Sequence, residues 1–327
     1  MPKFLVIILC VLSLCVSAQK NKPVSVIFDT DIAPDYDDVG AMALLHAFAD
    51  AGEAKILATI SCNAFETTVP TISLLNTYFG RPDIPIGITK RDKPNMSCQQ
   101  KWAEFIVDKY PHKVKSNAEA MEATKLYRKI LAKQPDQSVT IITVGFFTNL
   151  ADLLASQSDE FSKLSGKDLI KKKVKLLVSM AAGLNKENRG HEFNVHIDAK
   201  ASQKVFAEWN TPMLLSGFEV GERIRTGIRL INNESIQQSP VKDAYQVALA
   251  KDKNTIGRNS WDQTAVLVAV KGVEPYFSTR KLNFEITDDG SNVLIPGEKI
   301  MYLTEKMPTA EVTAIIEDLM MHQPKKK

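Results

Sequence analysis

Five carboxylates crowd into ten positions of the stretch VIFDTDIAPDYDDVGA, residues 26–41, directly after an apolar run. Two like charges about 4 Å apart repel by about 4 kcal/mol at an effective dielectric of about 20. One or two of these residues suit turns or helix N-caps, Asp37 above all. Five of them need a cation, and carboxylates without thiolate or imidazole partners suit a hard ion such as Ca²⁺ or Mg²⁺. They are Asp29, Asp31, Asp35, Asp37 and Asp38.

Two familiar acidic motifs do not fit this stretch. A calcium-binding EF-hand loop requires Gly at its sixth and Glu at its twelfth position. Counted from Asp29, those positions hold Pro34 and Gly40. Phosphotransferases of the haloacid dehalogenase type also place Asp-x-Asp after their first strand. They expect Thr or Val where this chain has Ala33, and they do not explain the second acidic pair.

The rest of the chain alternates short apolar runs with amphipathic stretches, which is typical of a parallel sheet covered by helices on both faces. The expected fold class is α/β, with an open, mostly parallel twisted sheet in a single domain over 19–327. Polar-apolar alternation over 276–305 predicts a small C-terminal antiparallel hairpin. The apolar runs predict strands at 24–28, 55–61, a short one ending at 86, 138–142, 174–180 and 213–216. The amphipathic stretches predict helices at about 38–51, 66–79, 117–133, 148–155, 199–209 and 309–321.

Ligands of an open α/β sheet bind outside the carboxyl ends of its strands. The loops that follow the predicted strands contain the acidic cluster, 61–63, 144–145, 181–194 and Glu219. The first, second and fourth of these loops carry side chains suited to metal and hydroxyl chemistry. We therefore expect the site at this edge of the sheet.

With these segments in place, the sequence resembles a known family. Asp29-Thr30-Asp31 followed by Asp37-Asp38 is similar to the N-terminal signature of the calcium-dependent nucleoside hydrolases, the inosine-uridine preferring family. The resemblance extends over about 25–270 and implies the nucleoside hydrolase fold. Each motif is weak alone, whereas several in the right order are specific. The others are TISCN at 59–63, TVGFFTNL at 143–150 for the family's TGxxTNLA, MAAG at 180–183 for its MGG turn, EFN at 192–194, and WD at 261–262 where the family has HD.

The resemblance also implies a role for each matching residue. Asp31 would act as the general base on a metal-bound water, and Asn194 is predicted to be catalytic through stabilisation of the transition state. Ca²⁺ would be bound by Asp31, Asp38, Asp262 and the backbone carbonyl of Val144, which stands where the family has Thr. The ribose hydroxyls would be held by Asp37, Asn63, Glu192 and Asn194, with Asn188 as a further sugar contact.

The residue types suit this chemistry independently of the resemblance. Cleavage of an N-glycosidic bond passes through an oxocarbenium-like sugar, which carboxylates and amide oxygens stabilise. A cation lowers the pKa of its water, and Asp, Glu and Asn offer the acceptors and donors that vicinal hydroxyls need. Glu192 and Asn194 are two residues apart, so an extended segment would point both side chains the same way. Asn63 and Asn188 also fit simple turn residues, and that alternative stays open.

Two departures from the family pattern leave parts of the mechanism open. The segment Ile32–Tyr36 is two residues longer than the shorter family motif. It brings Asp35, which we expect to contact a metal ligand rather than the metal. Trp261 stands where well-studied members have a His that protonates the leaving base, and none of the 5 histidines is an obvious substitute. We expect Trp261 to pack near the base, and a core aromatic residue that never meets substrate is the alternative. Base specificity stays open.

The first eighteen residues predict a cleaved secretory signal. Lys3 supplies a positive charge, Phe4–Val16 is almost purely apolar, and Val16-Ser17-Ala18 fits the cleavage rule. The apolar stretch is short for a bilayer span. Cys10 and Cys15 each follow a Leu, whereas a lipoprotein motif prefers a small residue there. We expect a secreted or periplasmic protein without a membrane anchor after cleavage, and lipidation is the less favoured alternative.

The chain carries a formal charge of +3 over 327 residues, which is too mild to indicate a nucleic-acid partner. Whether Cys62 and Cys98 pair stays open, and no His/Cys cluster indicates zinc. We predict a hydrolase that splits ribonucleosides into ribose and free base. The alternatives are hydrolysis of another N-riboside and a non-catalytic protein that binds nucleosides or ribose. A homo-oligomer, dimer or tetramer, is implied by the resemblance alone.

Overall fold

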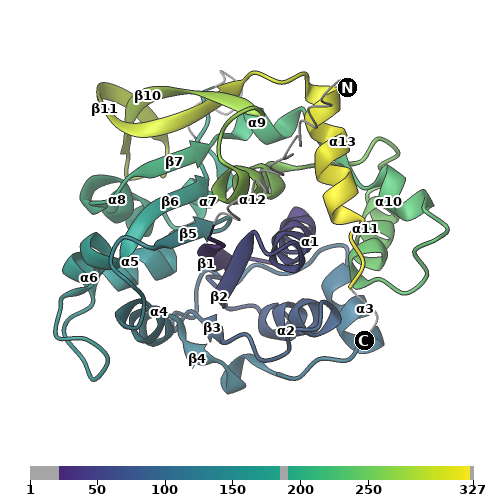
Figure 1. Cartoon of the computed structure of the whole chain (residues 1–327), viewed down its shortest axis with the longest axis horizontal. Coiled ribbons are helices and arrows are strands. Elements are labelled where there is room, and N and C mark those ends of the chain that lie inside the picture. Colours follow the sequence, from purple (N-terminus) through teal and green to yellow (C-terminus); the bar gives the residue numbers. More distant parts are fainter. Residues whose placement is uncertain (1–21, 185–190, 325–327) are drawn as a thin grey trace, which may run out of the picture.

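A nine-stranded sheet runs through the molecule in the order β10-β11-β7-β6-β5-β1-β2-β3-β4 (Figure 1). The computed structural model describes residues 22–184 and 191–324, so the expected signal at 1–18 and Asn188 lie outside the described residues. Neighbouring strands pair in parallel except β10 and β11, which confirms the predicted open, mostly parallel sheet. Within the described ranges no helix has the length and apolar character needed to cross a membrane.

The central strands are buried on both faces, which explains their near-continuous apolar sequences. In β1, Val26 and Phe28 point into one core and Ile27 points into the other. The strands of the large sheet are β1 (Val24–Thr30), β2 (Ala54–Ser61), β3 (Ile86–Ile88), β4 (Met121–Glu122), β5 (Val139–Thr143), β6 (Val174–Met180), β7 (Met213–Ser216), β10 (Phe277–Ile286) and β11 (Asn292–Glu305). A separate antiparallel pair is formed by β8 (Arg225–Thr226) and β9 (Arg258–Asn259).

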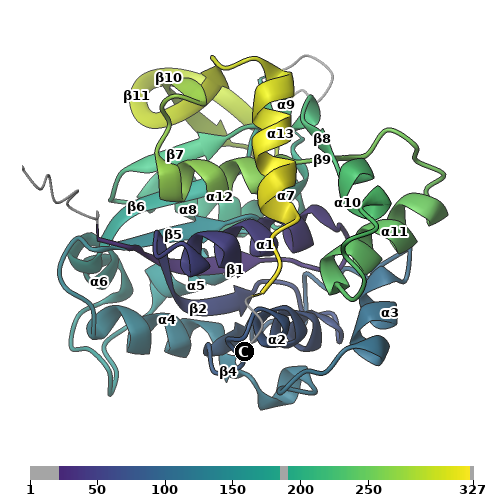
Figure 2. The ribbon, with the colours of Figure 1, turned by 45° about the vertical axis from the view of Figure 1, so that its right-hand side comes forward.

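Helices cover both faces of the sheet (Figures 1 and 2). The core that contains Val26 is closed by α1 (Asp37–Asp50), α2 (Thr68–Tyr78), α3 (Trp102–Lys109), α9 (Phe218–Glu222), α10 (Ile228–Asn232), α11 (Pro240–Lys251), α12 (Trp261–Lys271) and α13 (Thr309–Met320). The core that contains Ile27 is closed by α4 (Ala123–Ala132), α5 (Thr148–Ala155), α6 (Gly166–Lys173), α7 (Phe193–Ile197) and α8 (Ala199–Glu208).

One predicted helix, at 117–133, is wrong at its start. The structure has a 3-10 turn at Asn117–Glu119, then the edge strand β4, and α4 begins only at Ala123. Residues of β4 pair with Gly87 and Ile88 of β3, so the sheet edge outweighs the local helical pattern. The short third strand likewise begins at Ile86 rather than ending there.

The C-terminal hairpin is antiparallel as predicted, and it extends the main sheet because β11 also pairs in parallel with β7. Its second strand contacts the loop that follows β6. The side chain of Asn292 donates to the Gly183 carbonyl at 2.8 Å and accepts from the Gly183 N–H at 3.2 Å. This reciprocal pair joins the first residue of β11 to the loop that follows β6.

Strand β1 lies where the chain changes direction within the sheet. From β1 the chain adds β2, β3 and β4 on one side, and then β5, β6 and β7 on the other side. Such a switch point leaves a crevice at the carboxyl ends of the two strands that flank it, here β1 and β5. The acidic cluster follows β1 and Val144 follows β5, so both lie at this crevice.

Gly145 allows the loop after β5 to approach the loop after β1. A Cβ at this position would lie 2.5 Å from the backbone nitrogen of Asp31 and 2.7 Å from the sulfur of Cys62. Both distances are shorter than a carbon can adopt without displacing its neighbours. Cys62 and Cys98, whose pairing the sequence leaves open, are both buried free thiols.

We expect Gly145→Ala to lower the free energy of unfolding by about 1–3 kcal/mol, the usual cost of overpacking a core. The double variant with Cys62→Ala should recover only part of this loss, because the backbone of Asp31 still obstructs the added methyl group. Chemical denaturation of the wild type, the single variants and the double variant measures both effects. Wild-type stability of Gly145→Ala would contradict the close approach.

Candidate active site

A cavity of about 220 Å³ opens at the crevice between the β1 and β5 loops. It is bounded by the segments that follow β1, β5 and β6 and by the first residues of α1, α7, α9 and α12. The structure brings together most residues that the sequence singles out. Those in the cavity wall are Asp31, Asp35, Asp37, Asp38, Val144, Glu192, Asn194, Trp261 and Asp262, joined by Met180, Phe193, Phe218 and Arg258.

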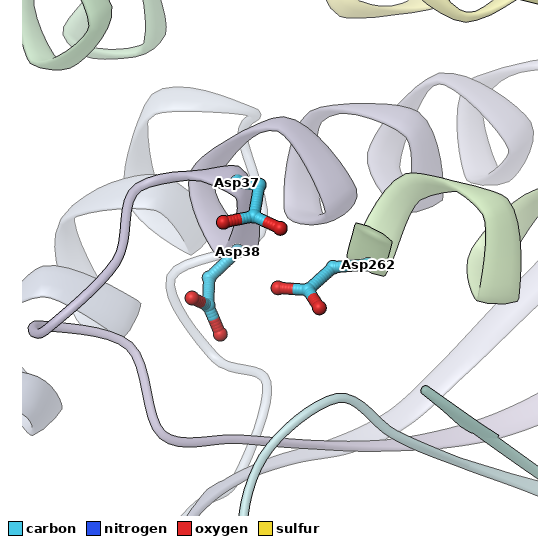
Figure 3. A group of neighbouring side chains, drawn as sticks. All are labelled: Asp37, Asp38 and Asp262. Atoms are coloured by element: carbon cyan, nitrogen blue, oxygen red, sulfur yellow. The ribbon is translucent and has the colours of Figure 1, made fainter. Parts of the chain in front are cut away.

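Three buried carboxylates converge at two helix ends (Figure 3). Asp37 and Asp38 come from the first turn of α1, and Asp262 comes from the first turn of α12. One oxygen from each residue lies within 4.8 Å of the other two. The partial positive charge of a helix N-terminus favours a carboxylate at this position. Three carboxylate oxygens at this spacing can bind one hard cation.

Burial makes the ionised form of this cluster unfavourable. It raises the pKa of Asp31 and of Asp262 well above the ordinary value, and the neighbouring carboxylates raise both further. Burial followed by the charge of Asp37 raises the pKa of Asp38 as well, although a hydrogen bond from the Thr30 hydroxyl opposes that rise. A bound cation would reverse these shifts, because it favours the charged form of every carboxylate around it.

The carboxylate and carbonyl oxygens of the cavity fit the predicted Ca²⁺. The three carboxylates that lie closest together differ in one residue from the ligands that the sequence predicts. Asp38 and Asp262 belong to the group of three, and its third member is Asp37, which the sequence predicts to bind ribose. Asp31 lines the same cavity outside this group. The Val144 carbonyl also lies in the wall and accepts a hydrogen bond from Asn194 at 3.3 Å. The identity of the ion and its full ligand set stay predictions.

Asp29, the first of the five clustered carboxylates, has a different environment. It accepts hydrogen bonds from the Tyr127 hydroxyl at 2.7 Å and from the Asn149 amide at 3.1 Å. Burial raises the pKa of Asp29 to about 7, against the effect of these donors. The residue does not line the cavity. It therefore ties β1 to α4 and α5 beneath the site.

Glu192 and Asn194 line the cavity from the start of α7. Glu192 is the N-cap, and its carboxylate accepts from the N–H groups of Asn194 at 3.0 Å, Val195 at 3.2 Å and Ala182 at 3.0 Å. Asn194 is already helical, so the argument from an extended segment does not apply here, and both side chains reach the cavity from the start of α7 instead. Its amide donates to the carbonyls of Val144 and Met180, which orients it in the wall. Burial raises the pKa of Glu192 to about 7 although the backbone donors oppose it.

Asn63, predicted to bind ribose, is completely buried and lies outside the cavity wall. Its amide donates at 2.9 Å to the carbonyls of both Asp31 and Met96, and its oxygen accepts from the Met96 N–H at 2.8 Å. The structure thus gives Asn63 a positioning task, since it joins the loop after β3 to the loop after β1. Its contact with ribose, like that of Asn188, stays a prediction.

Trp261 lies in the cavity wall, where its indole N–H donates to the Phe218 carbonyl at 2.8 Å. The two rings are 5.1 Å apart between centroids. Stacking of a base on Trp261 stays a prediction, and the indole N–H is already engaged. The two histidines near Glu192 do not line the cavity, because both contact the hairpin turn. His191 meets the Ser291 hydroxyl and His196 meets the Asp289 carbonyl.

Arg258 is a cavity residue that the sequence patterns do not predict. Its guanidinium contacts Asp37 Oδ1 through Nε at 3.1 Å and through Nη2 at 3.0 Å, and Nη2 lies 2.8 Å from Asp35 Oδ1. Burial opposes its charge, yet Asp37 and Asp35 together raise the pKa of Arg258 above its ordinary value. One signal in the sequence was available: this arginine stands four residues before Asp262, in a chain whose acidic cluster needs positive charge.

The sequence is similar to known nucleoside hydrolases. A family model described as inosine-uridine preferring nucleoside hydrolase matches residues 26–319. The pyrimidine-specific ribonucleoside hydrolase RihA of Klebsiella pneumoniae is 26% identical over 201 residues, 59% of this chain and 60% of that protein. RihA of a Shewanella strain is 25% identical over 199 residues, 60% of this chain and 59% of that protein. The chain thus spans about 60% of the length of the curated relatives it matches.

Solved structures share the fold. A plant nucleoside hydrolase superimposes with a TM-score of 0.69 at 17% identity, over 91% of this chain and 99% of the other. A purine-preferring ribonucleoside hydrolase from Gardnerella vaginalis also has a TM-score of 0.69, at 16% identity and with the same coverage of 91% and 99%. At these identities the likeness speaks for the fold alone, and it confirms the predicted nucleoside hydrolase fold.

We expect Glu192→Gln to reduce the pH dependence of stability in metal-free protein. The stability that neutral Glu192 contributes is complete below its ordinary pKa of 4.5 and is lost as the pH rises through its folded-state value of about 7. This difference in the pKa of Glu192 corresponds to a contribution of roughly 3 kcal/mol to the free energy of unfolding. Chemical denaturation in chelator between pH 5 and pH 8 should therefore show a steeper decline for the wild type than for the variant. The exposed control Glu311→Gln should keep the wild-type slope. Equal slopes for all three proteins would contradict the raised pKa.

Proposed function

This chain belongs to the inosine-uridine preferring nucleoside hydrolase family, and we propose that it hydrolyses the N-glycosidic bond of ribonucleosides to ribose and free base. One observation carries the proposal: a buried, oxygen-only cluster of carboxylates shares one cavity with the Glu192 and Asn194 side chains. Such a cavity can hold a cation and a polyhydroxylated sugar side by side.

The proposed cofactor is Ca²⁺, held by Asp38 and Asp262 together with Asp31, Asp37 and the Val144 carbonyl in the same wall. Bound there, the ion would lower the pKa of a coordinated water and position it. The carboxylates support this assignment because their burial calls for a divalent charge, and because no thiolate or imidazole ligand competes within the described cavity wall.

The chain's own residues supply the remaining chemistry. Asp31 accepts the proton of the attacking water, whose oxygen bonds to C1′ of the ribose. The C1′–N bond breaks, and its electron pair passes to the base. Glu192 and Asn194 hold the ribose hydroxyls, while the surrounding carboxylates stabilise the positive charge that develops on the sugar ring.

The proposal includes a secreted or periplasmic location, which rests on the signal pattern at 1–18. It leaves the base open, since the relatives named above differ in whether purines or pyrimidines are preferred. A non-catalytic nucleoside-binding protein is the second candidate, because Trp261 replaces the expected His in the cavity wall.

We expect Asp31→Asn to lower kcat on inosine and uridine by about 10²- to 10⁴-fold, the usual range for losing a general base. The fold should persist, because an amide replaces a buried carboxyl group whose pKa is raised. Release of reducing sugar from a panel of nucleosides measures turnover, and thermal denaturation checks the fold. Asp29→Asn is the matched control, since it removes an equally buried carboxylate outside the cavity.

The same panel separates the candidate functions. Chelation should abolish sugar release, and Ca²⁺ should restore it. Ribosides should be cleaved faster than 2′-deoxyribosides, because the deoxy sugars lack one gripped hydroxyl. Saturable nucleoside binding without any sugar release would establish the non-catalytic candidate. A fully active Asp31→Asn protein would exclude the mechanism.

We expect Trp261→Ala to reduce hydrolysis of inosine more than that of uridine, because the larger purine loses more stacking area. Trp261→Phe should recover part of the activity, and a p-nitrophenyl riboside should be affected least. The three rates are compared as kcat/KM. Trp209, a buried tryptophan outside the cavity, supplies matched control variants that should change stability without changing selectivity. Equal losses on all three substrates together with lower stability would assign Trp261 to the core.

A further inference from the structure

The two departures from the family pattern meet at one residue. Asp35 belongs to the lengthened segment after β1, and Trp261 replaces the expected His at the start of α12. They are far apart in the sequence, yet both contact Arg258. The guanidinium carbon lies 4.8 Å from the centroid of the Trp261 ring, and Nη2 lies 2.8 Å from Asp35. The sequence alone gives no reason for either departure, whereas the structure gives both a common partner.

Arg258 is fixed from its backbone outward. It lies on β9, where it pairs with Thr226 of β8. Its guanidinium packs over the Tyr36 ring at 5.1 Å as well as over Trp261, and Asp37 and Asp35 bind its Nε and Nη2 atoms. Only 17% of the side chain is exposed. A side chain held in this way loses little further freedom when a ligand arrives.

One edge of the guanidinium is uncommitted. Within the described residues Nε and Nη2 are engaged by carboxylates, whereas Nη1 forms no hydrogen bond. Arg258 lines the cavity beside Trp261 and Phe218. Arg258 thus has two N–H donors without a partner among the described residues, and it lines the cavity beside aromatic side chains, which suit the flat face of a base.

The chemistry of the leaving group calls for such a donor. When the C1′–N bond breaks, the electron pair and a negative charge pass to the base, unless an acid protonates it. Arginine stays protonated at neutral pH and so cannot act as that acid. It can stabilise the departing anion by charge and hydrogen bonding, and the base then takes its proton from solvent.

We infer that Arg258 stabilises the negative charge on the departing base, in place of the histidine acid, and that Asp35 is a positioning residue for its guanidinium. This inference rests on the proposed function. It also narrows the substrate class. Arginine has donors and no acceptor, so bases that present a carbonyl oxygen, such as hypoxanthine and uracil, suit it better than bases that present an amino group.

The alternative role is charge balance alone. Arg258 would then neutralise Asp37 and Asp35 without meeting the substrate. Its loss would reduce every rate equally, or would alter Ca²⁺ affinity and be corrected by more Ca²⁺. Both roles predict a slower enzyme, so the dependence on the leaving group must decide between them.

The experiment compares Arg258→Gln, Arg258→Lys and wild type on inosine, uridine and p-nitrophenyl riboside at several Ca²⁺ concentrations up to saturation. p-Nitrophenolate leaves as a stable anion and needs little help. We expect Arg258→Gln to lower kcat/KM on both nucleosides by about 10²-fold, comparable to the loss of one electrostatic donor, and to change the p-nitrophenyl rate by less than about threefold. Arg258→Lys should lie between, because it keeps the charge but loses the planar fork.

Two controls isolate the effect. Arg229→Gln removes an exposed arginine that also faces two carboxylates, those of Glu317 and Asp318, and it should leave all rates unchanged. Asp35→Asn should shift the ratio of nucleoside to p-nitrophenyl rates in the same direction as Arg258→Gln but less. The double variant should add little, since both residues act through one group.

The outcomes are distinct. Equal losses on all three substrates, no loss at all, or recovery with more Ca²⁺ would each overturn the inference while leaving the proposed function in place. A wild-type protein that cleaves the p-nitrophenyl riboside but no nucleoside would overturn the inference together with the proposed cleavage of ribonucleosides, and would leave a hydrolase of another riboside. A wild-type protein that cleaves none of the three would remove the proposed function and the inference together.

Discussion

Repulsion among buried carboxylates is the constraint on which the rest of this molecule depends. Burial and mutual charge raise the pKa of Asp31, Asp38 and Asp262, so the cluster resists ionisation unless positive charge is nearby. The N-termini of α1 and α12 offer some, but a helix end contributes typically 0.3–1 kcal/mol. One close pair of charges costs about 4 kcal/mol at an effective dielectric of about 20. Helix ends therefore cannot balance the cluster alone, and a divalent ion and a buried arginine are the partners that can.

The surrounding polar residues hold this arrangement in shape. Asn63 joins the β1 and β3 loops, and Asn149 binds Asp29 beneath the site. Glu192 accepts hydrogen bonds from two backbone N–H groups of α7 and from the Ala182 N–H in the loop after β6. The side chain of each of these residues forms hydrogen bonds with other protein groups. Gly145 lets the β5 loop approach Asp31. The cavity is thus organised by contacts that do not involve the cation, which is what electrostatic preorganisation requires.

Sequence patterns predict those parts that local chemistry determines. The apolar runs predict the central strands because both faces of the sheet are buried, and the acidic stretch after β1 predicts most of the cavity wall. They fail where distant pairing decides: residues 121–122 leave a helical pattern to join β3. They also leave out Arg258, which reaches Asp35 and Asp37 only because β9 precedes α12 and α12 packs against α1. The role of Asn63 is hidden for the same reason, since its partner Met96 belongs to another loop.

The missing histidine and the buried arginine fit one electrostatic arrangement. A histidine at position 261 would lie beside the guanidinium, which would lower its pKa and make it a poor source of a proton at neutral pH. An indole in the same place attracts the cation through its ring face, as the 4.8 Å contact to Arg258 shows. A buried guanidinium in turn needs anions around it, because an unpaired charge is costly to bury. Without Asp35, Asp37 would be the only carboxylate that pairs with Arg258, although it also belongs to the carboxylate cluster. The lengthened loop supplies Asp35 as a second anion, and this leaves Asp37 free to face the cluster as well.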